Sequence, residues 1–158
     1  MARSRRASRP ARVALAADLG SGIDGAWWPY SASVAAELPE LVSALQRRLG
    51  EVVGIQINWS AAESQLDLET LAAGVRAMHE GERDLRPRLM LVNGQSACAR
   101  MLVVPSMTSQ TLGLMMLRTA ARLPTAGADR DTRLFDLACA VMNLAEAECS
   151  KWSAAPGA

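Results

Sequence analysis

One dipeptide, Asn93-Gly94, constrains the fold of this 158-residue chain more than any other feature of the sequence. It separates two apolar runs, Arg88 to Val92 and Ala97 to Val104. Asn and Gly tolerate the positive φ values that both central residues of a type I′ turn require, so the pair predicts a β-hairpin here. The fold must therefore contain antiparallel sheet, and Pro105 should end the second strand.

Apolar periodicity predicts the elements on either side of this hairpin. Alternating residues indicate strands at about 12–17, 26–29 and 52–59. Apolar residues spaced by three and four indicate helices at about 34–49, 110–123 and 131–149. The order of these elements predicts an α+β domain, with a mainly antiparallel sheet of about five to six strands, helices on one face and a C-terminal helix.

The ends of the helices also carry sequence signals. Ser31 or Ser33 is suited to cap the 34–49 helix, and Gly50 suits the position just after it. Pro39 lies inside this helix, so its regular part is expected to begin there. Thr108 or Ser109 is the expected cap of the 110–123 helix.

The stretch from Ile23 to Ser31 holds two of the four tryptophans and the only tyrosine. Asp24-Gly25 is expected to form a turn. Trp27 and Trp28 are adjacent, so in an extended chain they point to opposite faces of the sheet. Large aromatic side chains most often anchor a core. The alternative interpretation is a ligand-binding cleft, with candidate residues Asp24, Trp28, Tyr30 and Trp59.

Asp-Gly-Ala-Trp-Trp-Pro at 24–29, followed by Ala-Glu-Leu-Pro-Glu-Leu-Val at 36–42, resembles an uncharacterised family of short actinobacterial proteins, a domain of unknown function. The similarity continues through Val75-Arg76 and 102–105, and covers roughly residues 11–122. Members of that family carry no established activity, so the resemblance implies a layout and no reaction or cofactor. This chain departs from the family at Met78-His79, where bulky aromatics are usual, and beyond about residue 125.

The segment 66–79 has two interpretations. Its apolar residues, Leu68, Leu71, Val75 and Met78, lie at helical spacing, and Gly74 weakens a helix only slightly. The family resemblance instead implies a hairpin of two strands, about 66–71 and 74–78. The hairpin is the prediction adopted for this segment.

Composition and charge narrow the class of protein. Half of the residues are hydrophobic and 21% are charged, which is typical of a globular domain. The net charge of +1 argues against electrostatic binding over the whole surface. No apolar run approaches the length of a membrane span, so no membrane association is expected. Cys98, Cys139 and Cys149 are scattered and odd in number, which favours free thiols and a cytoplasmic protein.

Known catalytic and metal-binding motifs are missing from the sequence. Gly20 and Gly22 lack the third glycine and the following helix of a dinucleotide-binding loop. His79 is the only histidine, with no Cys or carboxylate at ligand spacing around it, so it is expected to be a surface residue. The sequence predicts no catalytic residue, no metal and no cofactor, and it favours a protein that is not an enzyme.

The chain starts with an Arg-rich segment that contains no acidic residue. Residues 1–10 are expected to be a disordered tail, whose arginines can contact nucleic-acid phosphates or an acidic partner. The α+β domain is expected over 11–124, a linker and C-terminal helix over 125–150, and a frayed tail over 151–158. The arginines of this segment are Arg3, Arg5, Arg6, Arg9 and Arg12.

These observations favour a non-enzymatic cytoplasmic binding or protein-interaction module. The C-terminal helix has an apolar stripe that must pack either on its own sheet or against a second copy, and the second outcome predicts a homodimer. The first alternative is a small-molecule-binding protein or cryptic enzyme with its site beside the Trp-Trp segment. The second is nucleic-acid association through the N-terminal Arg tail. The stripe consists of Leu134, Leu137, Ala138, Val141 and Leu144.

Overall fold

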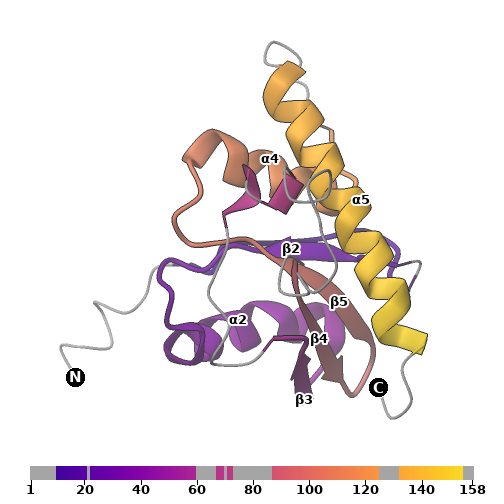
Figure 1. Cartoon of the computed structure of the whole chain (residues 1–158). Coiled ribbons are helices and arrows are strands. Elements are labelled where there is room, and N and C mark those ends of the chain that lie inside the picture. The colour runs from indigo at the N-terminus through magenta and orange to yellow at the C-terminus, as the bar shows by residue number, and fades with distance from the viewer. Residues whose placement is uncertain are drawn as a thin grey trace, which may run out of the picture.

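The computed structural model describes residues 10–20, 22–59, 67–69, 71–72, 87–124 and 132–154, and it contains the predicted hairpin (Figure 1). Strands β4 (Arg88–Gly94) and β5 (Cys98–Val103) pair antiparallel, with Arg88 opposite Val103 and Asn93 opposite Cys98. The two apolar runs thus form the predicted hairpin, and it lies at the centre of the sheet.

Three further strands extend the sheet on either side of this hairpin. Strand β3 (Val52–Ile57) pairs antiparallel with β4. On the other side β2 (Gly25–Trp27) pairs parallel with β5, and β1 (Val13–Leu15) pairs antiparallel with β2. The strand order is β1-β2-β5-β4-β3. The sheet is mixed but mostly antiparallel, which confirms the predicted α+β class.

The turn of the hairpin differs from the type I′ turn predicted at Asn93-Gly94. Strand β4 continues through Gly94, whose N–H donates to the Ala97 carbonyl (2.9 Å). Gly94 is absent from the described residues with positive φ, so the turn does not use it for its φ. A Cβ there would instead collide with the Leu49 carbonyl oxygen. Gly94 is required because the end of a helix packs directly on this turn.

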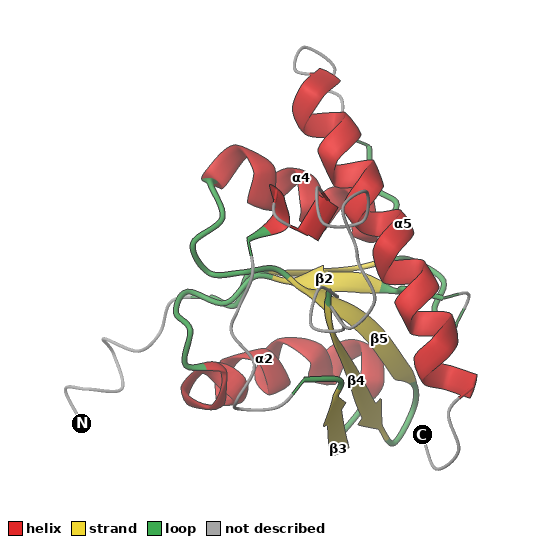
Figure 2. Cartoon of the chain, in the orientation of Figure 1, coloured by secondary structure: helices red, strands yellow, loops and turns green. Residues whose placement is uncertain are grey.

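Helices lie on both faces of the sheet (Figure 2), so the prediction that they share one face is wrong. Helix α2 (Val34–Leu49) packs on one face, and α4 (Gln110–Ala120) and α5 (Thr132–Ala154) pack on the other. The physical reason lies in the strands, where neighbouring residues such as Met101 and Leu102 are both fully buried. Because neighbouring side chains point to opposite faces, both faces are apolar and both must be covered.

Helix α2 has the predicted bounds, and Gly50 after it has a φ of 77°. Pro39 lies within the helix rather than at its start. Proline cannot donate the i to i−4 hydrogen bond, so the carbonyl of Ala35 loses that partner. At the other end, the Leu49 carbonyl accepts hydrogen bonds from the N–H groups of Ser96 (2.8 Å) and Ala97 (3.3 Å). The hairpin turn therefore satisfies a carbonyl that the helix leaves free.

Helix α4 starts as predicted and ends three residues early. Its N-cap is Ser109, whose hydroxyl accepts from the Leu112 N–H (3.4 Å). At its other end, the Arg122 guanidinium donates to the Ile23 carbonyl (3.0 Å). The first end of α4 is thus capped locally, and the chain just after its last turn is tied to the loop before β2.

Helix α5 packs on its own chain rather than projecting free. Ala138, Val141 and Ala145 are fully buried in the same cluster as the buried residues of α4. The Glu146 carboxylate accepts from the Ile23 N–H (3.2 Å), which ties α5 to the loop before β2. Much of the stripe is therefore buried within its own chain, and the homodimer stays a prediction.

The segment after β3 is helical where it is described. Residues 68, 69, 71 and 72 are in helical conformation, and Leu68 and Leu71 are buried in the core beside α4. The prediction of a strand over 66–71 is therefore wrong, and the helical spacing of the leucines was the better guide. The second predicted strand, at 74–78, and His79 lie outside the described residues.

Candidate functional site

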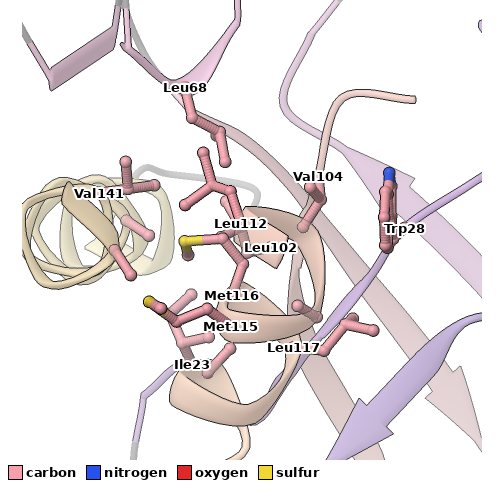
Figure 3. Packing of buried hydrophobic residues seen from close by; sticks show 14 of the residues in the cluster. Ile23, Trp28, Leu68, Leu102, Val104, Leu112, Met115, Met116, Leu117 and Val141 are labelled. Atoms are coloured by element: carbon pink, nitrogen blue, oxygen red, sulfur yellow. The ribbon is translucent and has the colours of Figure 1, made fainter. Parts of the chain in front are cut away.

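Trp27 and Trp28 point to opposite faces of the sheet, as predicted. Trp27 is 1% exposed and packs with the residues of α2. Trp28 is 3% exposed and belongs to the cluster under α4 and α5. Figure 3 shows Trp28 at the margin of this cluster. Both rings thus anchor a core, one on each side of the sheet.

The Trp28 ring is enclosed by a cation and a helix. The Arg12 guanidinium lies 3.6 Å from the centroid of Trp28 and 4.0 Å from that of Tyr30. The same group donates to the carbonyls of Trp28 (3.0 Å) and Pro29 (2.8 Å). On the helix side, a Cβ at Gly113 of α4 would overlap the six-membered ring of Trp28. The indole Nε1 is buried without a hydrogen-bond partner.

Tyr30 lies next to this enclosure and is held mainly by its backbone. Its hydroxyl donates to the Pro10 carbonyl (2.8 Å). The Glu37 carboxylate, in the first turn of α2, accepts from the N–H groups of Tyr30 (2.7 Å) and Ser31 (2.6 Å). Ser33 is the N-cap of α2 but makes no side-chain cap bond. Glu37 places a carboxylate in the first turn of α2 and ties the chain before the helix to it, whereas the side-chain cap predicted for Ser31 or Ser33 is absent at the N-cap Ser33.

Asp24 occupies a structural position at the other end of β2. Its carboxylate is 1% exposed and accepts from the N–H groups of Gly20 (2.7 Å) and Arg100 (2.9 Å). The predicted Asp24-Gly25 turn is absent, because Gly25 is the first residue of β2. A Cβ on Gly25 would collide with the Ala14 carbonyl oxygen in β1. Asp24 and Gly25 therefore hold β1, the loop after it and β5 close together.

Trp59, the fourth candidate, lies on the opposite side of the sheet from Trp28. It packs against the cluster beneath α2, and the Arg88 guanidinium lies 5.0 Å from the centroid of its ring. The structure thus brings Trp28 and Tyr30 together around Arg12, and it places Asp24 and Trp59 elsewhere. A ligand-binding role for these residues stays a prediction.

The exposed edge of β3 is the surface feature that sequence reasoning missed. Strand β3 ends the sheet order, and its side chains Val53 and Ile57 are 64% and 44% exposed. The register with β4 shifts between Val52 and Gly54, so Val53 is an extra residue in a bulge. The signal in the sequence is a run of uncharged residues that begins at Val52 and extends beyond the strand, but periodicity alone does not say which strand lies at an edge.

The backbone of β3 has an inward and an outward set of hydrogen-bonding groups. The Asn58 N–H donates to the Leu89 carbonyl (3.2 Å), so it points toward β4. Backbone groups of an antiparallel strand alternate in direction, so those of Gln56 also point inward and those of Ile55 and Ile57 point outward. The outward N–H and C=O groups lie along the edge of β3 that no strand of the described residues pairs with.

The described residues give less support to nucleic-acid binding, metal binding or a membrane span. Arg12 is engaged with Trp28, Tyr30 and Pro29, and the other four arginines of the N-terminal segment lie outside the described residues. Nucleic-acid association through the tail therefore stays a prediction. Where the structure describes the chain, no three His, Cys, Asp or Glu side chains gather as metal ligands. Within the same residues, no helix has both the length and the apolar character to cross a membrane.

Comparison with known proteins identifies the family. The model of DUF5994, a family of unknown function, matches residues 12–120, well over half of the chain. The chain therefore belongs to this family, and the match confirms the resemblance to an uncharacterised family over nearly the predicted range. Helix α5 lies outside the matched residues. Neither the curated proteins nor the solved structures contain a match to the chain.

Proposed function

We propose that this DUF5994 chain is a non-enzymatic protein-interaction module that binds an extended polypeptide segment along the free edge of β3. The observation that carries the proposal is an apolar strand at the end of the sheet order, with Val53 and Ile57 exposed. Proteins commonly recognise extended segments by adding them to an open sheet edge. Backbone hydrogen bonds then provide affinity, and alternate side chains provide specificity.

The part of β3 beyond its bulge lacks other features that usually prevent strand addition. Exposed edge strands are commonly protected by charged residues, proline, a bulge or a covering element, and the bulge of β3 is confined to Val53 near its start. Strand β3 has the sequence Val-Val-Gly-Ile-Gln-Ile, with no charge and no proline. The opposite edge, β1, is only three residues long, and Arg12 just before it is bonded to the chain after β2. The open edge of β3 is therefore the better site for a partner strand.

A lysine on the edge should abolish this binding. We expect wild-type protein to bind a subset of short peptides with alternating apolar residues on an array, and Val53→Lys to weaken that binding by at least about tenfold. The matched control is Ala44→Lys, which adds the same charge on the exposed side of α2. Equal binding by wild type and Val53→Lys would contradict the proposal, and so would an absence of binding to any peptide.

A small molecule bound beside the Trp-Trp segment is the second candidate, and it is favoured by the unpartnered Nε1 of Trp28. Burying a donor without an acceptor is costly, so a ligand acceptor that reached Nε1 would be stabilised. Tyr30 is the predicted neighbour in such a site, since both rings contact Arg12. Asp24 and Trp59 do not contact Arg12 in the same way, so they would affect a ligand at Trp28 only by stabilising the surrounding fold.

Indole N–H resonances in nitrogen-15 spectra test this second candidate. Trp28 is identified by the resonance lost in Trp28→Phe, and Trp152 on α5 serves as the internal control. We expect a member of a library of small hydrogen-bond acceptors to shift the Trp28 resonance and leave that of Trp152 in place. A library that moves neither resonance, or both equally, would rule out a specific site at Trp28.

Three further proposals concern the cellular location, the source and the oligomeric state of the protein. We infer a cytoplasmic location because Cys98, Cys139 and Cys149 are all free thiols, which suits a reducing compartment. The motif at 24–29 and the resemblance it carries support an actinobacterial source. Homodimer formation through α5 has less support than a contact at the sheet edge, because the exposed residues of α5 are mainly polar. They include Arg133, Asp136, Asn143 and Lys151.

A further inference from the structure

We infer that the segment bound along β3 carries an aromatic side chain that lies over Gly54, within an apolar–polar–apolar–aromatic sequence that runs antiparallel to β3. The inference rests on the proposed function, in which this edge binds an extended segment, and it identifies the class of segment. The feature that carries it is a strand glycine that the packing of the described residues does not require.

Gly54 differs from the glycines that close packing requires. A Cβ at Gly25, Gly94 or Gly113 would overlap another part of the chain. A Cβ at Gly54 would meet, apart from its chain neighbours, only the Asn93 Nδ2 among the described residues, at an ordinary contact distance of 3.9 Å. Gly54 is also absent from the described glycines with positive φ, so the bulge beside it does not need glycine for its backbone conformation.

A glycine in a strand has a cost that some other feature must offset. It has no side chain to pack against its neighbours, and it loses more conformational entropy on folding than other residues do. A strand glycine often marks a bulge, a sharp bend or a place where a ligand approaches closely. Because neither the φ nor the packing of Gly54 requires glycine, we interpret the open space above it as room for a side chain of the bound segment.

The open space lies on the face of the sheet that points away from α2. Val52 and Ile55 both pack against the cluster beneath α2, since the extra residue of the bulge, Val53, lies between them. Neighbouring strand residues point to opposite faces, so Gly54 faces the other side, as does Asn93 opposite it on β4. Val53, next to the glycine, is 64% exposed and leaves apolar surface for a partner to cover.

An aromatic ring suits this space better than an aliphatic side chain. Aromatic side chains on a neighbouring strand compensate for edge glycines, because the ring lies flat over the bare backbone. The Asn93 Oδ1 accepts from the Cys98 thiol (3.1 Å), while its Nδ2 has no hydrogen-bond partner among the described residues. An amide N–H group can donate to the face of an aromatic ring. A ring over Gly54 would therefore contact both Val53 and this amide.

The backbone of β3 determines the rest of the sequence pattern. Ile55 and Ile57 direct their N–H and C=O groups away from β4, so two residues of an antiparallel segment can pair with them. Facing residues share a face of the sheet, so these two should be apolar and cover Ile57, which is 44% exposed. The residue between them faces the exposed Gln56 and should be polar. The next residue lies opposite Gly54 in a non-hydrogen-bonded pair, where Cα atoms are only about 4.5 Å apart.

Peptide titrations of the full-length protein test the pattern. The probe is Lys-Thr-Val-Thr-Val-Tyr-Thr-Lys with blocked ends, in which Val-Thr-Val-Tyr is the expected pattern. We expect it to bind about fivefold more tightly than the same peptide with alanine in place of tyrosine. The peptide of reversed order has the same composition and should bind as weakly as the alanine form. In nitrogen-15 spectra, the tyrosine peptide alone should shift the Asn93 side-chain NH₂ resonance, which is identified by its loss in Asn93→Ser.

Filling the space from the protein side provides a matched test. Gly54→Val should keep the Tm of the wild type, since its Cβ meets no close neighbour. It should lower the affinity for the tyrosine peptide by about fivefold and leave that for the alanine peptide unaltered, which is a coupling between the two side chains. Gln56→Val adds a β-branched side chain to the same face of the same strand, and it should keep the preference for the tyrosine peptide.

The outcomes separate this inference from the proposed function. Peptide binding that is sensitive to Val53→Lys, but equal for the tyrosine and alanine peptides, would overturn the inference and leave the proposed function standing. So would array peptides that bind while the probe does not. A large fall in Tm for Gly54→Val would also overturn the inference, because the fold itself would then need the glycine. A chain that binds no peptide would overturn both.

Discussion

Replacing Asp24 by alanine should lower the free energy of unfolding by about 3 kcal/mol. The carboxylate accepts from the N–H groups of Gly20 and Arg100 and is 1% exposed. Alanine leaves both N–H groups without this acceptor, and that of Arg100 lies in the partly buried strand β5. Chemical denaturation of wild type and variant, with equal slopes, measures the loss.

Two other substitutions make the test specific to these hydrogen bonds. Asp18→Ala removes an exposed carboxylate from the same loop and should change stability by less than about 0.5 kcal/mol. Asp24→Asn keeps one oxygen acceptor but presents an NH₂ group to the second N–H, so its cost should fall between the two. An Asp24→Ala protein as stable as Asp18→Ala would show that the carboxylate does not hold the loop to β5.

Replacing Gly113 by alanine should destabilise the protein by about 3 kcal/mol, although alanine favours helix by about 1 kcal/mol over glycine. The added Cβ overlaps the six-membered ring of Trp28. That ring is also confined by Arg12, whose guanidinium lies 3.6 Å from its centroid and bonds to two carbonyls. Neither the ring nor α4 has free space to move into, so thermal unfolding should show a large drop in Tm.

The cause of this loss can be checked in a double-mutant cycle. Combined with Trp28→Leu, the Gly113→Ala change should cost much less than it does alone, giving a coupling of at least about 1 kcal/mol. Leu114→Ala is the control within the same helix, since Leu114 is 45% exposed. Additive effects of the Gly113 and Trp28 changes would contradict the close packing of helix on ring.

The candidate site was only partly predictable from the sequence. Adjacent residues in a strand point to opposite faces, so the separation of Trp27 from Trp28 followed from their position alone. The grouping of Asp24, Trp28, Tyr30 and Trp59 depended on distances between strands, and the structure places Trp28 and Trp59 on opposite sides of the sheet. The sequence did not predict that Arg12 contacts Trp28 and Tyr30, or that Glu37 accepts from the Tyr30 N–H. These contacts join residues from different elements of the fold.

What the sequence determined by itself is the local structure. The apolar runs around Asn93-Gly94 determined the hairpin, and spacing by three and four determined α2, α4 and α5 with small errors at their ends. These features depend on side-chain periodicity and on capping residues such as Ser109 and Gly50, which act within a few residues. The same spacing determined the helical conformation at Leu68 and Leu71, against the family resemblance.

Only the tertiary structure decided how these elements meet. It placed β3 at the sheet edge, put helices on both faces, and packed α5 on its own chain. The packing also explains three glycines. Another segment approaches Gly25, Gly94 and Gly113 too closely to leave room for a Cβ. The physical reason is that apolar surface drives burial without specifying a partner, whereas contacts between segments distant in sequence depend on the packing of the whole domain.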